Sequence, residues 1–150
     1  MNEIKFVSFL DEIYLRKLEN LLFFNQNQKK VVSGILESIR IYGLPEIVNQ
    51  NGILRIKIGN LINIQTLFAI DTFNNNELAG VAIYFRKSDE EILLLHLSIN
   101  DEYSFTGKRA GYYLVFQIID KIKNSLKLMK NVKFLTIIYN NIKTKHIKIN

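Results

Sequence analysis

Residues 92–99 (ILLLHLSI) constrain the fold of this chain more than any other part of the sequence. Nearly every position is apolar, so a strand formed by them must be covered on both faces and lies centrally in a sheet. Turn-forming residues at 74–76 and 88–90 separate this strand from earlier stretches with strand-like spacing. These stretches are residues 53–58, 66–71 and 78–86. The short connections predict that residues 66–71, 78–86 and 92–99 form an antiparallel meander.

Helical spacing precedes this region. Apolar residues recur at intervals of three and four from Ser8, a candidate cap, to a polar break at residues 25–28. A second helix is predicted over residues 28–41, and Gly43 and Pro45 end it. We expect these two helices to form a layer that covers the sheet.

A third helix is predicted after the central strand, over residues 109–127. It is apolar over much of its circumference, which indicates burial on more than one side. Residues 132–139 predict a fifth strand, and Ile147 and Ile149 could line one more. Because a long helix separates them, the strands at 92–99 and 132–139 should be parallel and joined by a right-handed crossover.

The expected fold class is therefore α/β (α+β), with a mixed central sheet. The sheet combines an antiparallel meander with one parallel pair, and it is accompanied by N-terminal helices and one long crossover helix. A chain of 150 residues buries enough surface for one core, so we expect a single domain over residues 1–150.

The composition excludes several classes of site. The chain has no cysteine, which excludes a disulfide scaffold, a thiolate zinc site and a cysteine nucleophile. With His96 and His146 as the only histidines, no histidine-rich metal centre is expected. The first residues contain an acid and no apolar run, and the longest apolar stretch is far too short to cross a bilayer. We therefore expect a cytoplasmic protein without a metal or a membrane partner.

The positive charge is concentrated in the last third of the chain. Residues 1–104 carry 10 basic and 13 acidic side chains, whereas residues 105–150 carry 10 basic side chains and one acidic side chain. The chain is also biased in composition, with 17 Asn, 23 Ile and 15 Lys, so part of this charge is background. A one-sided basic region favours an anionic partner, and its position after a glycine loop favours one phosphate-sized site over a long polyanion.

The polar loop at residues 100–111 is the best candidate for that site. If the long helix starts near residue 109, Lys108 and Arg109 stand at its amino end, where unpaired amides and the helix dipole favour an anion. Gly107 and Gly111 would let a ligand approach the backbone closely. An ordinary glycine-containing loop with solvated basic residues has the same sequence features and stays as the alternative.

The order of elements over residues 77–139, together with this loop, resembles the GNAT superfamily of acyl-CoA-dependent N-acyltransferases. Residues 1–76 are compatible with that order. Gly111 matches the last position of the family's loop motif, Gln/Arg-x-x-Gly-x-Gly/Ala, whereas Thr106 and Arg109 depart from it. The motif falls on Thr106, Gly107, Lys108, Arg109, Ala110 and Gly111.

The resemblance implies an acetyltransferase, or another acyltransferase, that uses acetyl-CoA or a longer acyl-CoA as co-substrate. An amine would attack the thioester directly, and the loop amides would hold the pyrophosphate. His96 is the candidate general base, and Tyr139 is the candidate acid for the leaving thiolate. A structural strand histidine and a plain strand-end tyrosine are the alternatives for these two residues. The pantetheine arm would pair with the backbone of three residues where the fourth and fifth strands splay: Leu97, Ser98 and Ile99.

Two other functions stay open. Eleven residues follow the fifth strand, where the family continues further, so the chain would be a shortened enzyme, an inactive binding or regulatory module, or completed by a partner subunit. Tyr112, Tyr113 and Phe116 would suit a homodimer, although core packing accounts for them better. A nucleic-acid binder would use the C-terminal lysines, but no nucleic-acid motif is present. These lysines are Lys121, Lys123, Lys127, Lys130, Lys133, Lys143, Lys145 and Lys148.

Overall fold

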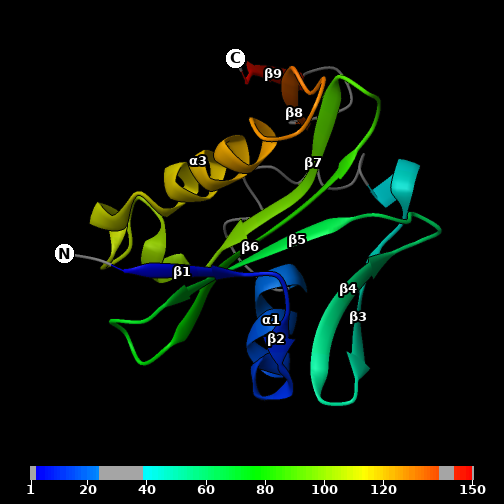
Figure 1. Ribbon diagram of the computed structural model, residues 1–150. Helices are drawn as coiled ribbons and strands as arrows, with labels where there is room; N and C mark the ends of the chain where they lie inside the picture. Colours follow the sequence, from blue (N-terminus) through cyan, green and yellow to red (C-terminus); the bar gives the residue numbers. More distant parts are fainter. Residues whose placement is uncertain (1–2, 24–38, 139–143, 150) are drawn as a thin grey trace.

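The computed structural model describes residues 3–23, 39–138 and 144–149, and their strands form two sheets (Figure 1). The larger sheet has six strands in the order β1-β5-β6-β7-β8-β9, and the smaller sheet has three in the order β2-β4-β3. The strands of the larger sheet are β1 (Ile4–Val7), β5 (Gln65–Asp71), β6 (Glu77–Arg86), β7 (Glu91–Ile99), β8 (Phe134–Ile138) and β9 (Thr144–Lys148). Those of the smaller sheet are β2 (Leu10–Asp11), β3 (Pro45–Gln50) and β4 (Ile53–Ile58).

The pairing of the larger sheet confirms the predicted fold class. β7 and β8 are parallel, and the other neighbours in this sheet are antiparallel. β5, β6 and β7 form the predicted meander, and Asn75 and Asn76 in the first turn have positive φ angles of 53° and 54°. Helix α3 (Leu114–Leu126) connects the parallel pair. The molecule is thus a mixed α/β (α+β) fold.

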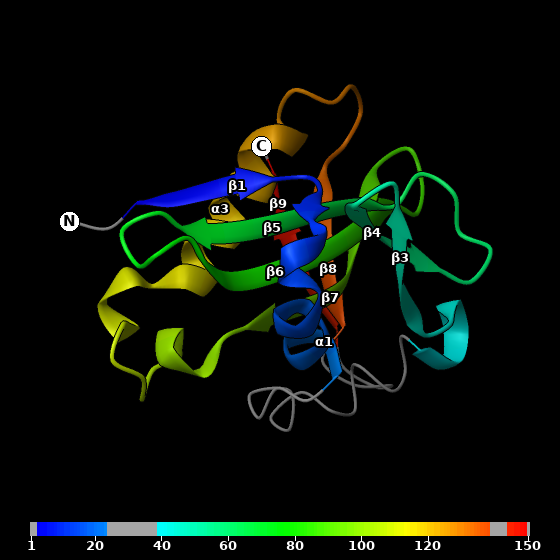
Figure 2. The ribbon, with the colours of Figure 1, turned by 90° about the horizontal axis from the view of Figure 1, so that it is seen from below.

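Helix α1 (Leu15–Phe23) and helix α3 lie on opposite faces of the larger sheet (Figures 1 and 2). Each face has its own apolar cluster. On one face, Leu18, Leu21 and Leu22 of α1 pack with apolar residues of the larger sheet and of β4. On the other face, α3 packs on the sheet through Leu114, Ile118, Ile122 and Leu126.

The central strand β7 is covered on both faces, as its sequence predicts. Leu93 and Leu95 belong to the cluster on the α1 side, whereas Ile92 and Leu94 belong to the cluster on the α3 side. All four side chains are buried. Removing one such leucine from water contributes roughly 1.5–3 kcal/mol, so this strand contributes to both halves of the core.

The N-terminal helix is shorter than predicted because the chain begins with strands. Helix α1 starts at Leu15 and not at Ser8. The residues before it pair as β1 with β5 and as β2 with β4, and Asp11 then accepts a hydrogen bond from the Ile13 amide at 2.9 Å to open the 3-10 turn η1 (Glu12–Tyr14). The sequence pattern did not predict β1 or β2.

The second predicted helix lies mostly outside the described residues. Residues 39–42 are helical, and Gly43 follows with a φ angle of 106°, as expected for a helix end. Pro45 was predicted only to stop this helix, but it also starts β3, an edge strand of the smaller sheet. Proline is tolerated there because the first residue of an edge strand has no obligatory amide hydrogen bond.

The third predicted helix starts five residues later than expected and is buried on one face only. Tyr113 has left-handed backbone angles, φ 50° and ψ 50°, which an α-helix does not continue through, so α3 begins at Leu114. The expectation of burial on several sides is wrong, because the buried residues recur every four positions. Tyr113 and Phe116 are exposed, so core packing does not account for them.

The C-terminal strands agree with the sequence pattern in number. β8 begins at Phe134, two residues later than predicted, and Ile147 lies in β9, the short final strand. Ile149 follows β9 and is buried in the cluster on the α3 side. The candidate acid Tyr139 lies outside the described residues.

Candidate functional site

The candidate site begins where β8 stops pairing with β7. Their register runs from Glu91↔Phe134 to Leu94↔Ile137, and β7 continues to Ile99. Within the described residues, β8 therefore pairs with only the first half of β7. The residues that follow β8, 139–143, lie outside the described residues, so the splaying of the fourth and fifth strands stays a prediction.

After Leu94, the peptide groups of β7 point alternately toward β6 and away from it. The Asn100 amide donates to the Ala79 carbonyl at 2.8 Å, and Ser98 is paired with Val81 in β6. Because hydrogen-bonded pairs alternate along an antiparallel ladder, the peptide groups of Ser98 point to β6 and those of Leu97 point away from it. Of the three predicted pantetheine partners, the peptide groups of Leu97 and Ile99 point away from β6 and those of Ser98 do not. The Ser98 hydroxyl donates to the carbonyl of Leu21 in α1 at 2.6 Å.

His96 lies on the α1 side of the sheet, on the same face as Ser98. The register of β6 and β7 shifts between Ile83↔His96 and Tyr84↔Leu94, which leaves Leu95 as an extra residue. Leu95 consequently packs on the α1 side while Leu97 packs on the α3 side, although simple alternation along the strand would place them on one face. His96 is 6% exposed, and burial lowers the pKa of its imidazole to about 4.

The loop after β7 is folded on itself by two 3-10 turns, η3 (Asp101–Tyr103) and η4 (Ala110–Tyr112). A Cβ atom at Gly107 would overlap the carbonyl oxygens of Asp101 and Glu102, so only glycine fits there. At Gly111 a Cβ atom would meet nothing within 4 Å. The first glycine of the motif is thus required by packing, and the second is not.

The loop amides are only partly available to a ligand. The amide of Gly107 donates to the Ser104 carbonyl at 3.0 Å, that of Arg109 to the Glu102 carbonyl at 2.7 Å, and that of Ala110 to the Gly107 carbonyl at 3.3 Å. No acceptor for the amides of Thr106 and Lys108 is present in the part of the chain that the structure describes. Of the loop amides that were predicted to hold a pyrophosphate, those of Gly107, Arg109 and Ala110 therefore already have acceptors within the loop.

Lys108 and Arg109 do not stand at the amino end of the long helix, contrary to the prediction. The helix starts at Leu114, and its first residues have no side-chain cap. Arg109 instead lies between two acids, with its Nε atom 3.8 Å from Asp71 Oδ2 and 3.8 Å from Glu102 Oε2. Arg109 therefore needs no bound anion, because the carboxylates of Asp71 and Glu102 lie beside it.

Sequence reasoning missed the buried cluster that holds this loop. Asp71, at the end of β5, is fully buried, and its Oδ1 accepts from the Phe73 amide at 3.0 Å. The hydroxyl of Tyr103 donates to Asp71 Oδ2 at 2.7 Å and receives the side-chain amide of Asn74 at 3.3 Å. Burial raises the pKa of Tyr103 well above its usual range, and the contact with Asp71 acts in the same direction. An aspartate before an Asn-rich turn indicates the turn, but the sequence gives no signal for partners about 30 residues away.

A second polar set joins the last three strands of the larger sheet. The hydroxyl of Thr136 in β8 donates to Glu91 in β7 and lies 2.8 Å from Nδ1 of His146 in β9. These are the residue types of a nucleophile, an acid and a base, but their order is wrong for nucleophilic catalysis. The hydroxyl lies between the carboxylate and the imidazole, whereas a triad needs the imidazole in the middle. The set therefore links three strands.

None of the protein families, curated proteins and solved structures compared with the chain matches it. The mixed six-stranded sheet is compatible with the N-acyltransferase fold, and the likeness rests on the element order, the parallel β7–β8 pair and the loop. The described helices include none that is long and apolar enough to cross a membrane. Among the described residues, no group of three acidic or histidine side chains could hold a metal ion.

Proposed function

We propose that the chain binds an acyl-CoA thioester, with acetyl-CoA as the first candidate, and transfers the acyl group to an amine. The arrangement of β7 carries this proposal. Among the described residues, the strand runs five residues past its last pair with β8, and the peptide groups of Leu97 point away from β6. The amides of a pantetheine arm can pair with strand backbone in the way that an added strand does.

The loop after β7 would meet the phosphates of the coenzyme. Its alternate amides at Thr106 and Lys108 and the charge of Lys108 favour an anion. Arg109 is assigned no phosphate contact, because it already lies beside Asp71 and Glu102. The proposal therefore shifts the phosphate contact from Arg109 to Lys108.

Catalysis would depend mainly on holding the amine against the thioester carbonyl. Because burial lowers the pKa of His96 to about 4, the imidazole is neutral at pH 7 and is a weak base for an ammonium ion. In this proposal the acceptor therefore enters as a neutral amine. Tyr139 stays the predicted acid for the leaving thiolate.

A catalytically inactive binding or regulatory module is the second candidate. It is favoured by one observation, the internal hydrogen bonds of the Gly107, Arg109 and Ala110 amides. A loop that satisfies half of its own amides needs no phosphate to hold it. This alternative predicts either no binding of the coenzyme or binding without turnover of any amine.

Thermal unfolding with and without acetyl-CoA tests the proposal. A ligand at ten times its Kd stabilises the folded state by about 1.4 kcal/mol, which for a chain of this size raises Tm by roughly 3–6 °C. Acetyl-CoA at millimolar concentration should produce such a shift. An unchanged Tm would overturn the proposal in both its catalytic and its binding form.

Two glycine variants make the test specific to the loop. Gly107→Ala forces the loop away from the Asp101 and Glu102 carbonyls and should abolish the shift with acetyl-CoA. Gly111→Ala is the matched control, since the added methyl group meets nothing, and it should keep the shift. Equal responses of the two variants would show that the loop does not bind the coenzyme. Far-ultraviolet circular dichroism checks that both variants fold.

A further inference from the structure

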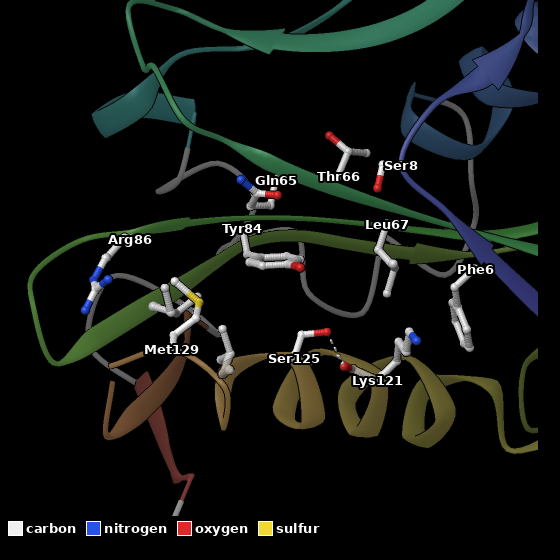
Figure 3. A pocket seen from close by; sticks show the side chains of 12 residues that line it. Phe6, Ser8, Gln65, Thr66, Leu67, Tyr84, Arg86, Lys121, Ser125 and Met129 are labelled. Carbon is white, nitrogen blue, oxygen red and sulfur yellow. Dashed lines mark hydrogen bonds between the residues drawn. The ribbon is translucent and has the colours of Figure 1, made fainter. Parts of the chain in front are cut away.

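A cleft of about 440 Å³ lies between α3 and the neighbouring strands β1, β5 and β6 (Figure 3). Its size falls in the range of small-molecule sites, about 300–1,000 Å³. The cleft includes no residue of the loop at residues 100–113 and none of the part of β7 that follows Leu94. The residues that line it are Phe6, Ser8, Gln65, Thr66, Leu67, Tyr84, Arg86, Ile92, Lys121, Ser125, Leu126 and Met129.

Tyr84 places an unpaired polar group in this cleft. The side chain is 9% exposed, and no hydrogen-bond partner for its hydroxyl is present among the described residues. Figure 3 shows the ring lying across the cleft, with the hydroxyl directed away from Arg86 and toward the end where Lys121 lies. The hydroxyl is open to the cleft, so a bound acceptor atom can take the place of water as its hydrogen-bond partner.

Burial also keeps the Tyr84 hydroxyl protonated, because it raises the pKa of the phenol. The group is therefore a hydrogen-bond donor at neutral pH. A donor in a cavity with apolar walls selects an acceptor such as a carboxylate or carbonyl oxygen.

The charged residues of the cleft have one sign. Lys121 and Arg86 line it and no acidic residue does. Arg86 donates to the carbonyls of Ser88, Asp89 and Lys130, at 3.3, 2.6 and 2.8 Å, so its orientation is fixed while its charge is not neutralised by a carboxylate. Lys121 has no ion pair within the described ranges. The cleft therefore favours an anion, and Lys121 is the cation that can reach it.

The remaining lining defines the body of the ligand. Phe6, Leu67, Ile92, Leu126 and Met129 form apolar walls, and the polar side chains are small or uncharged. We propose that this cleft binds an amphipathic monocarboxylate, with the carboxylate between Lys121 and the hydroxyl of Tyr84 and the apolar chain against these walls. A charge-assisted pair and a neutral donor together would fix the carboxylate end.

The proposal is tested by calorimetric titration of the full chain with octanoate. Octanoate should bind, whereas octanol and octyltrimethylammonium, which match its chain but not its charge, should bind more weakly. Equal binding of octanol and octanoate, or no binding of octanoate at millimolar concentration, would overturn the proposal.

Two substitutions and a matched control locate the site. Lys121→Gln should weaken octanoate binding at least about tenfold, and Tyr84→Phe, which keeps the ring, about threefold to tenfold. Lys123→Gln removes the same charge from the same helix outside the cleft lining and should leave the affinity unchanged. Equal losses for the variants at Lys121 and Lys123 would show only a general charge effect and would contradict the assignment.

This cleft does not depend on the proposed acyl transfer. Saturating acetyl-CoA should leave the affinity for octanoate unchanged, because the two sites share no residue. Competition between the two ligands would overturn the separate site. Octanoate binding without any acetyl-CoA shift would support the cleft and reject only the proposed function.

Discussion

Tyr84 and Tyr103 are both buried in the apolar cluster on the α3 side, but among the described residues only Tyr103 has a hydrogen-bond partner for its hydroxyl. The hydroxyl of Tyr103 donates to buried Asp71 and accepts from Asn74. That of Tyr84 faces an open cleft. Burial raises the pKa of both phenols.

This difference separates a structural tyrosine from a candidate binding residue. A raised pKa alone would mark both side chains as functional. The hydrogen bonds of the Tyr103 hydroxyl hold the loop at residues 100–113 to the end of β5. The hydroxyl of Tyr84 is available to donate to an acceptor atom of a bound ligand. The comparison can be tested by substitutions that change one region and spare the other.

The largest effect is expected from Asp71→Ala. The change removes the buried acceptor of Tyr103 and of the Phe73 amide and leaves Arg109 without its buried partner, so it should cost about 3–5 kcal/mol of unfolding free energy. The partial exposure of Arg109 favours the lower end of this range. Urea unfolding measures the loss.

Glu102→Ala is the control for that prediction. Its carboxylate lies at the same 3.8 Å from Arg109 Nε but is largely exposed, so its removal should cost no more than about 0.5 kcal/mol. Similar losses at Asp71 and Glu102 would mean that the buried cluster does not hold the loop.

A pH effect on stability through His96 should come next in size. The pKa of the imidazole is about 4 in the folded chain and 6.5 when unperturbed, so the unfolded state binds more protons between these values. The contribution of the neutral His96 imidazole to the free energy of unfolding is therefore complete above pH 6.5 and is lost as the pH falls toward 4. It amounts to roughly 3 kcal/mol.

His96→Gln tests this contribution, because the variant lacks the imidazole and keeps every other titratable group. Unfolding free energies of both proteins are measured from pH 7 to pH 4, and the wild-type curve should fall more steeply. Parallel curves would show that the imidazole is not buried in its neutral form.

The smallest effects are expected when the two tyrosines lose their hydroxyls. Tyr103→Phe removes a hydrogen bond to a buried carboxylate and should cost about 2 kcal/mol. Tyr84→Phe removes a hydroxyl without a partner and should change the unfolding free energy by no more than about 0.5 kcal/mol. If Tyr84→Phe costs as much as Tyr103→Phe, its hydroxyl is satisfied within the chain, and the proposed carboxylate site loses its donor.

The sequence predicted the elements whose burial pattern is strong. The period-two spacing of β4 to β7 predicts these strands, and the short turns between β5, β6 and β7 predict the meander. The length of the segment between β7 and β8 predicts the parallel pair. β1 was missed because it has only four residues, and β3 because its proline was interpreted as a stop signal. The start of α3 depends on the left-handed backbone of Tyr113, a residue type that does not predict such a conformation.

The candidate site was less predictable than the fold. Glycine spacing located the loop correctly, but whether its amides are free depends on hydrogen bonds to carbonyls within the loop. The face of each β7 side chain depends on the bulge at Leu95, which no periodicity indicates. Asp71, Tyr103 and Arg109 come together only through the fold, since their separation along the chain carries no motif. The cleft at Tyr84 joins α3 with three strands and has no signature in any one segment.

The outermost strand of the larger sheet gives part of the C-terminal charge another role. β9 (Thr144–Lys148) has the sequence TKHIK and ends the order of the six strands. An edge strand offers backbone groups to which a strand of another molecule could add, and lysines along it would bring like charges together in such a pairing. The exposed Lys148 would therefore oppose such edge-to-edge pairing, an effect that added salt would weaken.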